Sequence, residues 1–106
     1  MPEPAAIVYV VDDDPAVRDA VGFLVSSVGY EFLSCASGAE LLDRLDETRP
    51  SCIILDVRLP GISGLEIQRE LQNRNTSAGV IFITGHGDVP KAVRAMRHGA
   101  IDFLEK

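Results

Sequence analysis

Short, continuous apolar runs alternate along the chain with longer segments in which apolar residues recur every three or four positions. Runs rich in Val and Ile, such as residues 7–11 and 52–55, are typical of strands that are buried on both faces. Further strands are predicted over residues 31–35, 80–84 and 100–105. Because each strand is separated from the next by a helical segment, the pattern predicts an α/β domain with a parallel sheet and right-handed crossovers.

Four helices are predicted between the strands, and the residues before each segment favour a first helical turn. Asp14 can cap the first helix, with Pro15 at its first position. The segments 37–40 and 63–66 have the Ser-x-x-Glu spacing of a capping box, and Asp88 or a neighbour can cap the fourth helix. Glycines that follow the first and the fourth segment are expected to end those helices.

Three helical segments, the first, second and fourth, carry apolar stripes that should pack against the sheet. The stripe of the first helix runs over residues 17–28, and Met96 in the fourth helix is assigned to the core. The chain stops at Lys106, where a fifth helix is expected to follow the last strand. A parallel sheet needs helices on both faces, so we expect one face near the fourth and fifth strands to lack part of its cover.

Composition narrows the function classes. The chain has 106 residues, 46% of them hydrophobic, which is enough to bury the core of one domain. Its net charge of −6 argues against direct nucleic-acid contacts, which need clustered Lys and Arg. No apolar run is long enough to span a bilayer. Cys35 and Cys52 are interpreted as buried small hydrophobes, which favours a reducing, cytoplasmic location.

The predicted strands end in polar residues that suit phosphate chemistry. Asp12 and Asp13 follow the first strand, Asp56 ends the third, Thr84 ends the fourth and Lys106 follows the fifth. Ligands of open α/β sheets bind outside these carboxyl ends. Mg²⁺ prefers oxygen ligands such as carboxylates, while an ammonium and a hydroxyl group can contact phosphate oxygens. The residues therefore predict phosphoryl transfer to the carboxylate of Asp56.

Four motifs at these strand ends resemble the receiver domains of two-component response regulators. They are VDDD at 11–14, LDVRLPGISG at 55–64, TGHGD at 84–88 and FLEK at 103–106. The run 84–90 looks most like receivers of the nitrogen-fixation regulator type and of some sigma-54 activators. The resemblance implies a flavodoxin-like, doubly wound sheet of strand order 2-1-3-4-5, formed by one domain over residues 1–106 that lacks its final helix.

The resemblance also implies roles for the acidic residues. Asp56 is expected to be the phosphoacceptor. Asp13 and Asp56 are expected to be direct Mg²⁺ ligands together with the backbone carbonyl group of Arg58. Asp12 is expected to act mainly through a metal-bound water. Asp14 is interpreted as a helix cap rather than as a metal ligand.

The remaining roles concern the phosphoryl group and its effect. By resemblance, Lys106 binds the phosphate, and Thr84 and Phe103 are paired switch residues, although Phe103 also suits an ordinary core position. A sensor histidine kinase is the implied partner and phosphodonor. The chain is then not an enzyme beyond self-phosphorylation and self-dephosphorylation, and its output is transcriptional, through a C-terminal DNA-binding domain.

Several alternatives stay open at this point. An aspartyl-nucleophile phosphatase of the haloacid dehalogenase type would need a second acid two residues after Asp56, where Arg58 stands. A pseudo-receiver would keep the fold as an interaction module without phosphorylation. Lys91, Arg94 and His98 form either a solvated cationic face or part of a homodimer surface made by the fourth helix and fifth strand.

Overall fold

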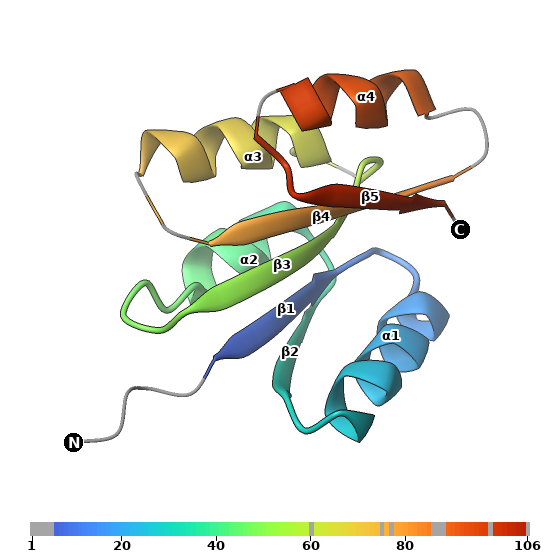
Figure 1. The fold of residues 1–106 in the computed structure, drawn as a ribbon, viewed down its shortest axis with the longest axis vertical. Coiled ribbons are helices and arrows are strands. Elements are labelled where there is room, and N and C mark those ends of the chain that lie inside the picture. The colour runs from blue at the N-terminus through green and yellow to red at the C-terminus, as the bar shows by residue number, and fades with distance from the viewer. Residues whose placement is uncertain are drawn as a thin grey trace.

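The computed structural model describes residues 6–59, 61–74, 76, 78–85, 89–97 and 99–105. Its parallel strands form one sheet of order β2-β1-β3-β4-β5, which confirms the predicted fold class and strand order. Figure 1 shows this sheet with its helices. The elements in chain order are β1 (Ile7–Val11), α1 (Pro15–Ser27), β2 (Glu31–Cys35), α2 (Gly38–Arg44), β3 (Ser51–Asp56), α3 (Gly64–Asn73), β4 (Gly79–Thr84), α4 (Val89–Arg97) and β5 (Asp102–Glu105).

The predicted helix signals act as expected. The side chain of Asp14 accepts a hydrogen bond of 2.9 Å from the backbone N–H group two residues later, and caps α1. The hydroxyl groups of Ser37 and Ser63 each accept from the N–H group three residues later, and so cap α2 and α3. Gly29 and Gly99 follow α1 and α4 with φ angles of 95° and 100°, which favour glycine. The cap predicted near Asp88 lies outside the described residues.

Helices α2 and α3 cover one face of the sheet, which we call the packed face. Alternate strand residues point to it and are fully buried there, including Tyr9, Leu55 and Phe82. Leu41 from α2 and Ile67 from α3 fill the space above them without any exposed surface. In Figure 1, α4 lies beside α3 on this side. Most of the hydrophobic core therefore lies between the sheet and these helices.

Helix α1 lies on the opposite face, which we call the open face. It packs on the β1–β2 side, where Gly22 leaves room for the ring of Phe32: a Cβ atom at Gly22 would lie 2.4 Å from that ring. Farther across the face, Leu104 of β5 is 55% exposed. Leu24, which the predicted α1 stripe assigned to the core, is 64% exposed. Among the described residues, this face lacks part of its cover, as the sequence predicted.

Two predictions about the C-terminal third are wrong. Strand β5 begins at Asp102 rather than at residue 100, because the ladder with β4 starts at the pair of Asp102 with Ile81. The N–H group of Ile101 donates to the carbonyl oxygen of Val80 just before the ladder. Met96 is not a core residue, because it is 37% exposed on α4. No helix among the described residues has the length and apolar character to cross a membrane.

Candidate phosphoacceptor site

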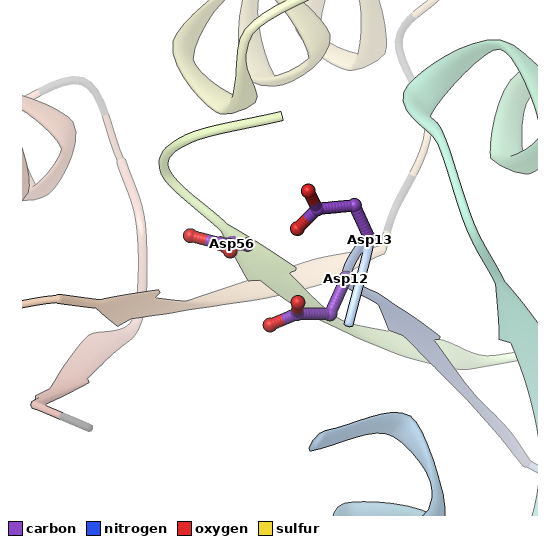
Figure 2. Close-up of side chains that lie close together, drawn as sticks. All are labelled: Asp12, Asp13 and Asp56. Atoms are coloured by element: carbon purple, nitrogen blue, oxygen red, sulfur yellow. The ribbon is translucent and has the colours of Figure 1, made fainter. Parts of the chain in front are cut away.

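The sheet register brings the predicted acidic residues together. Val11 of β1 pairs with Leu55 of β3, so the residues that follow them, Asp12 and Asp56, lie side by side where the two strands end. Asp13 extends from the same turn. Figure 2 shows the three carboxylates gathered at this edge of the sheet. Residues more than 40 positions apart in the sequence therefore form one cluster.

The geometry of this cluster suits a small, hard cation. One carboxylate oxygen from each of Asp12, Asp13 and Asp56 lies within 4.8 Å of the other two. Asp12 and Asp56 are buried, while Asp13 is exposed. Three carboxylates at this spacing repel one another, and a divalent cation that takes oxygen ligands relieves the repulsion. The donor set therefore fits the predicted Mg²⁺, with one side of the cluster open to solvent through Asp13.

Local hydrogen bonds fix two of these carboxylates. Oδ1 of Asp12 accepts from the N–H group of Asp14 at 2.9 Å. Oδ1 of Asp56 accepts from the N–H group of Arg58 at 3.0 Å. Each bond closes a short turn just after a strand, so the chain direction beyond β1 and β3 is set by the acidic side chains themselves.

Helix α3 holds the backbone of Asp56. The N–H group of Gly64 donates to the carbonyl oxygen of Val57 at 3.1 Å. A Cβ atom at Gly64 would lie 2.5 Å from the carbonyl oxygen of Asp56 and 3.0 Å from the ring of Phe82. Only glycine allows the first turn of α3 to approach the end of β3 this closely.

Thr84 lies at the end of β4, beside the strand that ends in Asp56. It is fully buried, and no protein atom in the described part of the chain hydrogen-bonds its hydroxyl oxygen. A buried hydroxyl without a partner costs free energy, so such a group is expected where a ligand can satisfy it. This observation supports the role predicted for Thr84.

Phe103 lies on the neighbouring strand. Thr84 pairs with Glu105, and Phe82 pairs with Phe103, so Thr84 and Phe103 are diagonal neighbours on the packed face. Phe103 is half-buried against the core rather than fully enclosed. The position suits both interpretations given above, because the ring contacts the core and also has a partly open side.

Three predicted features are not placed by this geometry. Lys106 and His98 lie outside the described residues, and so does the side chain of Lys91. The side chain of Arg58 is exposed, and the role of its carbonyl group as a metal ligand stays a prediction. The carboxylate cluster, Thr84 and Phe103 are therefore the parts of the predicted site whose side chains the structure describes near this edge.

One residue at the site was missed by the sequence interpretation. Arg18 of α1 is half-buried, and its Nη1 donates to the carbonyl oxygen of Asp12 at 2.7 Å. A single arginine on a helix gives little signal by itself. Its position four residues after the Asp14 cap was the available clue, because it places the side chain one turn above the acidic loop.

Comparison with known proteins decides the family. Residues 8–106 match the model of the response regulator receiver domain. The chain belongs to this family. The resemblance predicted from the sequence is thereby confirmed, and the fold and the acidic edge described above are those of a receiver domain of a two-component response regulator.

Individual relatives agree with this assignment. The chain is 50% identical over 101 residues to nodulation protein W of Bradyrhizobium diazoefficiens, covering 95% of the chain and 44% of that protein. It is 51% identical over 106 residues to transcriptional regulatory protein FixJ of Azorhizobium caulinodans, covering all of the chain and 50% of that protein. The chain thus spans about half the length of these curated relatives.

A solved structure shows the same fold. The crystal structure of full-length FixJ from B. japonicum superimposes with a TM-score of 0.89 at 40% identity, covering 97% of the chain and 51% of that protein. The strand order and the placement of the helices therefore match a receiver domain that has been observed within a longer protein.

Proposed function

We propose that this receiver domain accepts a phosphoryl group on Asp56 from a sensor histidine kinase and uses Mg²⁺ to do so. The cluster of Asp12, Asp13 and Asp56, with carboxylate oxygens within 4.8 Å of one another, is the observation that carries the proposal. Asp13, Asp56 and the carbonyl group of Arg58 would hold the ion directly, and Asp12 would hold it through a water. The bound ion supplies positive charge that offsets the charge on the phosphoryl oxygens.

The protein's own part in the reaction is to position a nucleophile. An oxygen of the Asp56 carboxylate attacks phosphorus, the phosphorus–nitrogen bond to the kinase histidine breaks, and an acyl phosphate forms on Asp56. The imidazole nitrogen that loses phosphorus keeps the electron pair of the broken bond and takes up a proton from solvent or a neighbouring group, which gives neutral histidine. The bond from the Arg58 N–H group and the contact of Gly64 with the Asp56 backbone hold the carboxylate in place for this attack. Lys106 would pair with a phosphoryl oxygen.

Thr84 would pass the change to the surface. Its buried hydroxyl group, which neither accepts nor donates a hydrogen bond among the described residues, can donate one to a phosphoryl oxygen on Asp56. To make this bond, the Thr84 side chain would move toward Asp56 and leave space beside β5. The half-buried ring of Phe103 can enter that space. The surface of α4 and β5 would then change its population of states and its tendency to form a homodimer.

The remaining parts of the proposal rest on the relatives. FixJ is a transcriptional regulatory protein, and the chain spans half of its length, so we assign the output to a DNA-binding domain in the same protein. We place the domain in the cytoplasm, which suits its two free cysteines. The domain's own activity would be limited to self-phosphorylation and self-dephosphorylation at Asp56.

Labelling with a small phosphodonor tests the chemistry. Acetyl phosphate with Mg²⁺ should add one phosphoryl group to the intact mass, and removal of Mg²⁺ or the change Asp56→Asn should abolish the addition. Asp19→Asn is a matched control, because it removes an exposed carboxylate of α1 away from the cluster and should leave labelling unchanged. Equal labelling of Asp56→Asn would contradict the assignment, and the absence of any labelling would favour a pseudo-receiver.

A second experiment tests the switch. Beryllofluoride, a mimic of the aspartyl phosphate, should shift the amide signals of Thr84, Phe103 and the first turns of α4 most strongly among residues outside the site. Thr84→Ala should still form the adduct but should lose the shifts at Phe103 and α4. If the shifts are confined to residues at the site in the unaltered chain, the domain binds the group without transmitting it.

A further inference from the structure

We infer that Arg18 is a positioning residue that fixes the loop carrying Asp12 and Asp13 for metal binding. The inference rests on the proposed function, since it concerns how that metal site is held. Nη1 of Arg18 donates to the carbonyl oxygen of Asp12 at 2.7 Å. That carbonyl group belongs to the peptide unit that joins Asp12 to Asp13. The bond therefore fixes the orientation of this peptide plane, which leads directly into the Cα atom of Asp13 and so helps to set the direction of its side chain.

The bond completes a closed set of contacts around the loop. The Asp12 side chain accepts from the Asp14 N–H group, the Asp14 side chain accepts from the Ala16 N–H group, and the Arg18 N–H group donates to the Asp14 carbonyl oxygen. These contacts fix the start of α1 relative to the loop. The Arg18 guanidinium adds a bond from the next turn of the helix back to the end of β1.

The charge of Arg18 also acts on α2. The pKa of the Glu40 carboxyl group on α2 is lowered, chiefly by a hydrogen bond from the Ala36 N–H group, then by Arg44, and further by the charge of Arg18. The contact that places the guanidinium is its hydrogen bond to the carbonyl oxygen of Asp12. Because the side chain is half-buried, its position is restricted by packing as well as by charge.

Two roles for this arginine predict opposite results. As a charge alone, Arg18 repels a cation, so its removal should strengthen Mg²⁺ binding. As a positioning residue, it keeps two carboxylates in the geometry that Mg²⁺ requires, so its removal should weaken binding. The sign of the change in the Mg²⁺ dissociation constant therefore separates positioning from electrostatics.

Titration of the whole chain with Mg²⁺, followed by calorimetry or amide chemical shifts, gives this sign. Arg18→Gln should weaken binding about tenfold, which is the lower end of the effect of residues that support metal ligands. Arg18→Lys keeps a donor and a charge, and should recover part of the loss. Arg44→Gln is the matched control: it removes the same charge near Glu40 but leaves the contact with Asp12, and its affinity should equal that of the unaltered chain.

A structural readout accompanies the titration. Relative to the unaltered metal-free chain, the amide signals of Asp13 and Asp14 in the Arg18→Gln protein should shift more than those elsewhere. The rest of the spectrum should match that of the folded, unaltered chain. Equal or tighter Mg²⁺ binding by a folded Arg18→Gln protein overturns the inference and leaves the proposed function intact. If the Asp13→Ala protein binds Mg²⁺ as tightly as the unaltered chain does, the proposed metal site itself is overturned.

Discussion

The two faces of the sheet differ although the same strands form both. On the packed face, Tyr9, Leu55 and Phe82 are fully buried beneath α2 and α3. On the open face, Val10 is fully buried near α1, but Leu104 at the far side is 55% exposed. The strand sequences are apolar toward both faces, so they would suit cover on both. An apolar run thus predicts a strand better than it predicts how much of that strand is buried.

Truncation of one leucine on each face should give the largest difference in stability between the two faces. Leu55→Ala on the packed face should lower the free energy of unfolding by about 2–5 kcal/mol, because it removes contacts and leaves a cavity. Leu104→Ala on the open face should cost less than about 1 kcal/mol, because much of that side chain is already in water. Urea unfolding of both variants measures the two values. Losses of equal size would mean that the open face is covered in solution.

The two cysteines report the same difference by their reactivity. Cys35 is fully buried on the packed face, and burial, with a smaller contribution from Glu40, raises the pKa of its thiol to about 11. Cys52 is half-buried on the open face, and burial raises the pKa of its thiol as well. Iodoacetamide should modify Cys52 at least about tenfold faster, equivalent to about 1.4 kcal/mol in activation free energy, because it is more accessible.

Peptide mass mapping during the reaction would measure these two rates. Cys52→Ser is the control, and the folded variant should be almost unreactive. Modification of Cys35 at the rate of Cys52 would show that the packed face opens as readily as the other.

The smallest expected effect concerns the carboxylate cluster at the edge of the sheet where the strands end. Removing one of three clustered carboxylates relieves repulsion, so Asp13→Ala should stabilise the metal-free protein by about 1 kcal/mol. The variant should lose Mg²⁺ binding. For the unaltered chain, Mg²⁺ at a concentration equal to its dissociation constant should add only about 0.4 kcal/mol. Thermal or urea unfolding with and without Mg²⁺ measures both effects.

Asp43→Ala serves as the control for this test. It removes an exposed carboxylate of α2 outside the cluster, and it should change the stability little. A metal-free Asp13→Ala protein that is less stable than the unaltered chain would show that the cluster is not under electrostatic strain.

Local signals explain why so much of the fold was predicted. The caps at Asp14, Ser37 and Ser63 are formed by side chains that bond within three residues, so the sequence alone contains all their determinants. Asp12, Asp13, Asp56 and Thr84 were found because they follow apolar runs, and parallel strands place their ends at one edge. The family resemblance then supplied their expected roles.

The errors have tertiary causes. Met96 was assigned to the core by its helical spacing, but spacing cannot show how closely α4 approaches the sheet. The start of β5 depends on whether residues 100 and 101 join the ladder with β4, which the apolar pattern alone does not decide: Ala100 is buried and Ile101 is exposed, and the ladder begins at Asp102. Arg18 was missed because its partner is a backbone carbonyl oxygen, which leaves no trace in the pattern of side chains.

The contact of Gly64 with Asp56 has a consequence for how variation in this chain is interpreted. A saturation library scored for phosphoryl acceptance should show position 64 to be almost as intolerant as position 56, because every other residue adds a Cβ atom 2.5 Å from the carbonyl oxygen of Asp56. Gly64 has no reactive group, so that intolerance would arise from shape alone. A tolerance map of this domain would therefore mark the start of α3 as part of the site, although the residue found there contributes only the absence of a side chain.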